Sequence, residues 1–120
     1  MIIGSNDEKL ENIMRDMKSY TSTQLRKSIA NNPYESRKEW MLEMMQKAGK
    51  QNGNNNDWQF WQQNNHPMEL FSPHIANQKL NYIHFNPVEA GFVDKEEEWL
   101  FSSARNYYGL KSITEVELIG

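Results

Sequence analysis

The sequence contains no cysteine, so neither a disulfide nor a thiolate metal site contributes to its fold. It also lacks any run of about 20 consecutive apolar residues, the length that a membrane-spanning helix needs. Residues 1–8 have no basic stretch and no long apolar run, which argues against a secretory signal peptide. These absences predict a cytoplasmic protein with no membrane partner.

Apolar residues are also scarce. They make up 38% of the 120 residues, against roughly 45–50% in typical domains on a count that includes glycine. A chain of this length predicts one domain, residues 1–120, with a small core that a second subunit completes. The net charge is −3, and this opposes nucleic-acid binding, which usually needs a basic surface.

A first helix is predicted over residues 6–29. Ser5 and Glu8 form a capping-box pattern, and apolar residues then recur at helical spacing. Four cations lie mainly off the apolar stripe, where they form either a solvated face or an edge that contacts phosphates. They are Arg15, Lys18, Arg26 and Lys27.

A second capping box, Ser36 with Glu39, predicts a helix with its apolar stripe over residues 40–48. Gly49 stands where a left-handed C-terminal cap is expected. Residues 50–57 are polar and predict a loop.

A β-hairpin is predicted next, with strands beginning at Trp58 and at Met68 and a turn over residues 64–67. Its aromatic residues either pack in the core or a dimer contact, or stack on unpaired nucleic-acid bases. These residues are Trp58, Phe60 and Trp61.

Ser72 and Pro73 have the residue types of a helix N-cap and first position. We expect this helix to end at residue 84 or 85, because the residue before Pro87 disfavours the α conformation. A last short helix begins at Ser102 or Ser103 and ends at Gly109. Residues 1–4 predict the end of a strand, and residues 113–119 form either a strand or a contact with another subunit.

Three polar residues of the third helix share one face, because they lie one turn apart: Gln78, Tyr82 and Asn86. Tyr82 is either a nucleophile beside a metal or phosphate ligand, or a core tyrosine that bonds to an amide. His84 lies off this face and favours a structural role, whereas His66 precedes a proline in a turn and favours a surface position.

Residues 82–93 (YIHFNPVEAGFV) and 102–109 (SSARNYYG) closely resemble the C-terminal signature of the REP-associated tyrosine transposases, which belong to the HUH superfamily of single-tyrosine transposases. Weaker similarity covers residues 9–18, 35–49 and 60–71. The resemblance implies an α+β fold, a partial ferredoxin-like sandwich with an antiparallel sheet and helices, completed by dimerisation.

The resemblance also implies a chemistry. Family members cut single-stranded DNA, usually at a hairpin-forming end, by attack of a tyrosine hydroxyl that leaves a 5′-phosphotyrosine. The matching tyrosine is Tyr82, and Asn86 takes the place of a ligand to a divalent metal, Mg²⁺ by preference. The substrate class is DNA and not a small molecule. The candidate DNA-binding residues are Arg15, Lys18, Arg26 and Lys79.

One departure from the family is large, because the paired His-hydrophobe-His metal ligands are missing. The chain has only His66, His74 and His84. In the family the histidine pair precedes a segment like residues 1–5, so Met1 resembles an internal residue of a longer domain. We therefore expect a truncated transposase domain that binds no metal and cuts little or no DNA. The alternative is a non-enzymatic module that binds hairpin DNA or pairs with a transposase.

Overall fold

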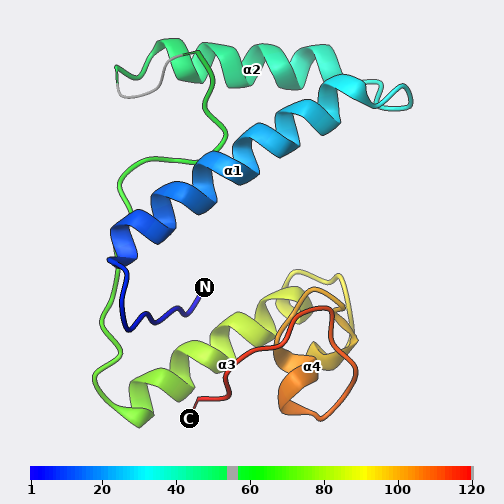
Figure 1. The fold of residues 1–120 in the computed structure, drawn as a ribbon. Coiled ribbons are helices and arrows are strands. Elements are labelled where there is room, and N and C mark those ends of the chain that lie inside the picture. Colours follow the sequence, from blue (N-terminus) through cyan, green and yellow to red (C-terminus); the bar gives the residue numbers. More distant parts are fainter. Residues whose placement is uncertain (54–56, 120) are drawn as a thin grey trace. The chain divides into compact units, whose positions relative to one another are not determined.

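The computed structural model describes residues 1–53 and 57–119, which form helices joined by extended segments (Figure 1). Two compact units are present, and each is described by itself. The N-terminal unit comprises residues 3–66, and the C-terminal unit comprises residues 1–2 and 67–119. The expectation of a single domain stays a prediction. The helices are α1 (Leu10–Asn31), α2 (Lys38–Lys50), α3 (Pro73–Glu89), the 3-10 helix η1 (Glu96–Glu98) and α4 (Ala104–Tyr107).

The predicted α+β fold is wrong, because residues 1–53 and 57–119 contain no β-strand and therefore no part of a ferredoxin-like sheet. The hairpin fails because the segment that begins at Trp58 bonds to the helices. The backbone N–H of Gln59 donates to the carbonyl oxygen of Met45 at 3.0 Å. The indole N–H of Trp61 donates to the hydroxyl of Thr21 at 2.7 Å. The remaining loop prediction, over residues 50–57, falls partly outside the described residues.

Residues 1–4 were expected to be the end of a strand, and for residues 113–119 a strand was one of two alternatives, but neither segment forms a strand. In residues 113–119 the backbone is held by side chains of α4 and not by a neighbouring strand. Asn106 donates to the carbonyl oxygen of Thr114 at 3.0 Å, and the Tyr107 hydroxyl donates to that of Ile119 at 3.0 Å.

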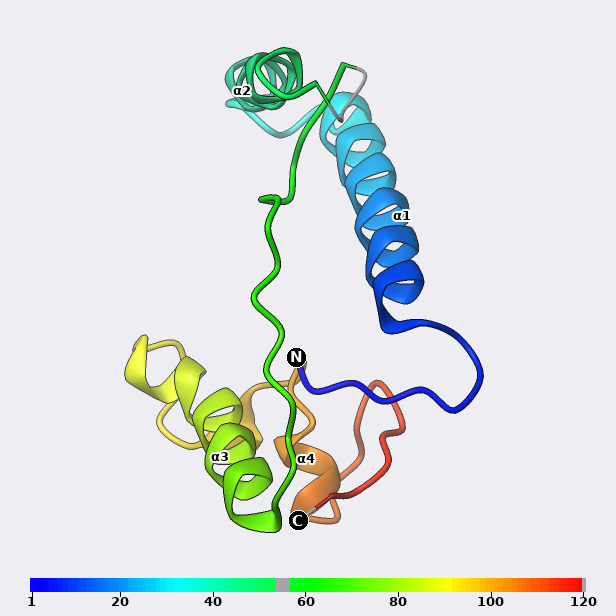
Figure 2. The same cartoon turned by 90° about the vertical axis from the view of Figure 1, so that its left-hand side faces the viewer.

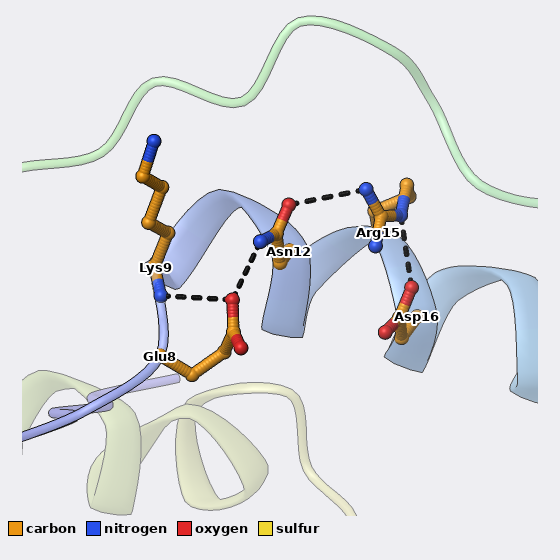
Figure 3. Close-up of polar contacts among 5 residues, drawn as sticks. All are labelled: Glu8, Lys9, Asn12, Arg15 and Asp16. Carbon is orange, nitrogen blue, oxygen red and sulfur yellow. Dashed lines mark hydrogen bonds and ion pairs between the residues drawn. The ribbon is translucent and has the colours of Figure 1, made fainter.

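In the N-terminal unit, α1 begins at Leu10, later than predicted, because Ser5 caps a local turn ahead of the helix. The Glu8 backbone N–H donates to the Ser5 hydroxyl at 3.0 Å. The Glu8 carboxylate then accepts from the backbone N–H of Lys9 and from the Asn12 amide (Figure 3). These bonds satisfy donors at the helix start, which intrahelical bonds leave without partners.

Helix α2 packs against α1 and buries Met45, which is 9% exposed. Gly49 lies inside α2 and not at a left-handed cap, so that part of the prediction is wrong. A Cβ atom at this position would lie 2.6 Å from the backbone carbon of Asp57 and 2.7 Å from its oxygen. Glycine is therefore needed for the close approach of the chain that follows α2. Ser36 does not cap α2, because the N-cap is Arg37.

In the C-terminal unit, α3 packs against η1, and η1 packs against α4. Ser72 is confirmed as the N-cap of α3, since its hydroxyl accepts the backbone N–H of Ile75 at 3.3 Å, and Pro73 is the first helical residue. The buried side chains are Leu80 and His84 from α3 and Ala104 from α4.

The predicted end of α3 is wrong, because the helix continues through Pro87 to Glu89. Its C-cap is Ala90, and the next residue, Gly91, has a φ of 77°. The N–H of Phe92 donates to the carbonyl oxygen of Pro87, and that of Gly91 to Val88, both at 2.9 Å. This is a Schellman motif, which satisfies the last carbonyls of the helix. Gly109, with a φ of 66°, ends α4 as predicted.

Of the helices in the described part of the chain, none has the length and apolar character that crossing a membrane requires.

Candidate functional site

Tyr82 lies on the exposed side of α3, with 63% of its surface accessible. Gln78 and Asn86, one turn before and after it, are also exposed, whereas Leu80 and His84 turn into the core. Tyr82 is therefore not a core tyrosine. Among the described residues, its hydroxyl forms no hydrogen bond, so it is free to meet a ligand from solution.

Asn86 lines an open groove of about 440 Å³ in the C-terminal unit. The groove is mainly apolar. Its aromatic wall is a row in which Phe92 stacks on Trp99 at 5.7 Å and Trp99 meets Phe101 edge-on at 5.8 Å between ring centroids. Phe92 and Phe101 are more than two-thirds exposed. Apart from Ser102 and Ser103, the residues that line the groove with Asn86 are apolar.

The residues around Tyr82 do not fit a Mg²⁺ ion, which takes several oxygen ligands at near-octahedral geometry. In the carboxylate cluster of residues 96–98, two of the three side chains have partners: Glu98 accepts the backbone N–H groups of Asp94 and Lys95, and Glu96 accepts the Tyr108 hydroxyl. Across residues 1–53 and 57–119, no group of three or more His, Cys, Asp or Glu residues could hold a metal. Asn86 thus offers one amide oxygen without the carboxylates or imidazoles that a metal needs.

His84 is 7% exposed and has a structural setting. Its Nε2 atom lies 2.9 Å from the Ser103 hydroxyl, and its ring meets Tyr107 edge-on at 5.2 Å. Burial lowers the pKa of His84, and the negative charge of Glu96 offsets part of this effect. The neutral imidazole therefore links α3 to the start of α4. By contrast, His66 and His74 are exposed.

A second groove, of about 670 Å³, lies in the N-terminal unit between α1 and residues 57–65. It gathers three of the four candidate DNA-binding residues, namely Arg15, Lys18 and Arg26. Lys79, the fourth, lies on α3 in the other unit. We call the groove the α1 groove. Its opposite wall carries the aromatic residues Trp58, Phe60 and Trp61.

The wall of the α1 groove is fixed to α1 by side chains. The Lys18 ammonium donates to the carbonyl oxygen of Gln62 at 2.9 Å and to the side-chain oxygen of Asn65 at 2.6 Å. The Arg26 guanidinium lies 4.9 Å from the centre of the Trp58 ring. Figures 1 and 2 show the extended segment of residues 57–66 running past α1. These bonds span more than 30 residues, and no local pattern in the sequence points to them.

Arg15 is held at the other end of the groove. Its Nε atom donates to Asp16 at 2.9 Å, and one terminal nitrogen donates to the Asn12 side chain at 3.1 Å (Figure 3). These bonds lie along the surface of α1. They restrict the guanidinium to the groove's rim without using all five of its N–H donors.

No protein-family model matches the chain, and neither a curated protein nor a solved structure matches it.

Proposed function

We propose that this chain is a DNA-binding relative of the single-tyrosine transposases, in which Tyr82 keeps the place of the nucleophile but the chain alone does not cut DNA. The proposal starts from the resemblance of residues 82–93 and 102–109 to the family's tyrosine segment. The observation that carries it is the exposure of Tyr82 on α3, with Asn86 one turn further on. A phenol buried in the core would have no access to a phosphodiester.

The absence of cleavage follows from the chemistry of the phenol. A tyrosine hydroxyl is a weak nucleophile unless a base or a metal activates it. In the described residues neither a hydrogen-bond acceptor nor a set of metal ligands faces the Tyr82 hydroxyl. Attack on phosphorus also builds charge on the phosphate oxygens, which members of the family stabilise with a divalent metal. Binding is therefore the activity that this chain supports by itself.

Pairing with a second subunit is part of the proposal, and exposed apolar surface supports it. Helix α1, every residue of which is described, buries none of its side chains. In the C-terminal unit Phe71, Phe92 and Phe101 are each more than 70% exposed. Surface of this kind on a soluble chain usually marks a contact with another protein. The partner is a second copy of the chain or, in the alternative function, a complete transposase that supplies the metal ligands.

A gel-shift experiment tests the function. The probe is a DNA hairpin with a single-stranded flank, at low salt, with and without Mg²⁺, and each sample is run on native and denaturing gels. We expect a shifted band on the native gel in both conditions and no covalent adduct on the denaturing gel. Failure to bind at low salt overturns the proposal.

The denaturing gel shows whether the chain cuts DNA or only binds it. A Mg²⁺-dependent adduct that disappears in Tyr82→Phe would show that the chain is a competent nickase, contrary to the proposal. Addition of a complete transposase whose own tyrosine is replaced by Phe tests the pairing alternative. An adduct of this chain's mass, formed only in that mixture and only with Tyr82 present, would establish it.

A further inference from the structure

The α1 groove has the composition of a surface that binds unpaired nucleotides. Proteins that bind single strands without sequence preference combine cations along the backbone path with aromatic rings on which bases stack. In the α1 groove, α1 supplies the cations and the facing segment supplies the rings. We propose that this groove is a binding site for single-stranded nucleic acid and that it works without a metal and without Tyr82.

The rings are available for stacking. Phe60 is 43% exposed and Trp61 is 40% exposed. They meet edge-to-face with centroids 5.1 Å apart, so each keeps one face open toward a ligand. The bond from the Trp61 indole to Thr21 fixes the direction of that ring before any base arrives. A platform that is already ordered loses little side-chain entropy on binding.

Arg26 is the cation best placed to meet a phosphate. Its guanidinium is held over the Trp58 ring, and in the part of the chain that the structure describes it forms no hydrogen bond or ion pair. Its N–H donors are therefore free for a phosphate, which a guanidinium can bind through two parallel bonds. Lys18 is used differently, since its ammonium holds the groove wall in place through Gln62 and Asn65.

The acidic composition of the whole chain does not oppose this site, because the charge is unevenly divided. The N-terminal unit holds nine of the 13 Lys and Arg residues but only eight of the 16 Asp and Glu residues. The net charge of −3 therefore arises in the C-terminal unit. Among the described residues that line the groove, Asp57 is the one carboxylate, beside three cations, of which Arg15 is paired with Asp16. The local sign favours a polyanion.

The geometry also selects unpaired strands over a duplex. In a duplex the base faces are stacked on one another and closed to Phe60 and Trp61, so only the phosphate contacts remain. Stacking adds affinity for every exposed base regardless of its identity, since each base has a π-face. The site should therefore accept a homopolymer such as oligo-deoxythymidine.

Fluorescence anisotropy with a labelled oligo-deoxythymidine of about ten nucleotides tests the site on the full chain, with EDTA present. We expect Phe60→Ala and Arg26→Gln each to weaken binding by at least about tenfold, a change of 1.4 kcal/mol. Tyr34→Ala and Lys50→Gln are the controls, an exposed ring and an exposed cation of the same unit that are not among the residues lining the groove. We expect both controls to bind like the unmodified chain. Circular dichroism confirms that all four variants fold.

Two further probes sharpen the result. A duplex of the same length should bind at least about tenfold more weakly, because stacking is lost. Oligo-5-methyluridine of the same length carries the same base and phosphates and differs only in the sugar. Tight binding of either single strand supports the site, and the tighter one identifies the sugar that the groove takes. No binding of either strand at low salt, equal losses in the controls, or a duplex that binds as well as the single strand would each overturn the proposal.

These outcomes are separable from those of the proposed function. Hairpin binding that survives Phe60→Ala would rule out the α1 groove as the binding site and would leave the proposed relationship to the transposases unaffected. Binding of oligo-deoxythymidine through the groove, with no shift of the hairpin probe, would support the groove and overturn the proposed function.

Discussion

The indole N–H of Trp61 donates a hydrogen bond of 2.7 Å to the hydroxyl of Thr21, 40 residues earlier in the chain. The Thr21 hydroxyl in turn donates to the carbonyl oxygen of Met17 at 2.8 Å, within α1. One short chain of bonds thus ties the extended segment to the helix. It turns a stretch that resembles a β-strand in composition into one wall of the α1 groove.

A double-mutant cycle measures this tie. We expect Trp61→Phe and Thr21→Val to show a coupling of about 0.5–1.5 kcal/mol in urea unfolding, the net value of one hydrogen bond. Thr23→Val is the control, since Thr23 lies on the same helix and lines the groove but forms no bond with Trp61. Equal coupling of Trp61→Phe with both threonine variants would contradict the assignment.

Gly49→Ala reports on the close approach of Asp57 to α2. Helix propensity alone would make alanine more stable by about 1 kcal/mol in the interior of a helix. We expect the opposite sign, a loss of about 1–3 kcal/mol, because the new Cβ would overlap the backbone of Asp57. Thermal unfolding distinguishes the two signs. Gly53→Ala, where the added carbon meets no atom within 4 Å, should change the melting temperature little.

His84 makes the stability of the C-terminal unit depend on pH. Burial lowers its pKa in the folded chain, against the opposing effect of Glu96, so the folded state binds fewer protons than the unfolded one. His84 therefore makes its full contribution to the free energy of unfolding above the ordinary histidine pKa of about 6.5, and this contribution falls as the pH drops below that value.

Hydrogen exchange of α3 and α4 amides, measured on either side of about pH 6.5, checks the effect of His84. We expect His84→Gln to remove part of the pH dependence and His74→Gln, which changes an exposed histidine in the same helix, to leave it intact. If His84→Gln and the unmodified chain lose protection in parallel as the pH falls, the imidazole is not the responsible group.

Self-association should be measurable by sedimentation equilibrium. The exposed aromatic residues of the C-terminal unit predict a homodimer, and Phe101→Glu should shift the equilibrium toward monomer by placing a charge in the apolar surface. Phe71 is exposed but does not line the groove that contains Phe101. Phe71→Glu therefore tests whether the dimer contact is confined to that groove. A chain that stays monomeric at all concentrations would contradict the prediction.

The helices could be predicted from the sequence because the signals that specify them are local. Ser72 and Pro73 mark the start of α3, and Gly109 marks the end of α4, each through residues a few positions away. The end of α3 was missed because the bias against helix before a proline was outweighed at Pro87 by the cap that follows at Gly91. A preference of that kind shifts a boundary and does not fix it.

The sheet was mispredicted for a different reason. The alternation of Trp58 and Phe60 with polar residues is typical of a strand, but a strand exists only when a second one pairs with it. Here the hydrogen-bonding groups of the segment are used by Met45 of α2 and by Lys18 and Thr21 of α1. The same long-range contacts create the α1 groove. The sequence therefore identified the cations as candidates, but it did not show that they face the aromatic rings.

Binding of DNA is the central claim, and one titration tests it most directly. A labelled hairpin with a single-stranded flank is titrated with the chain at low salt without Mg²⁺, in competition with unlabelled duplex of equal length. We predict that the hairpin is bound and that the duplex competes at least about tenfold less well, since only unpaired bases stack. No measurable binding, or competition by the duplex at equal strength, would contradict the account.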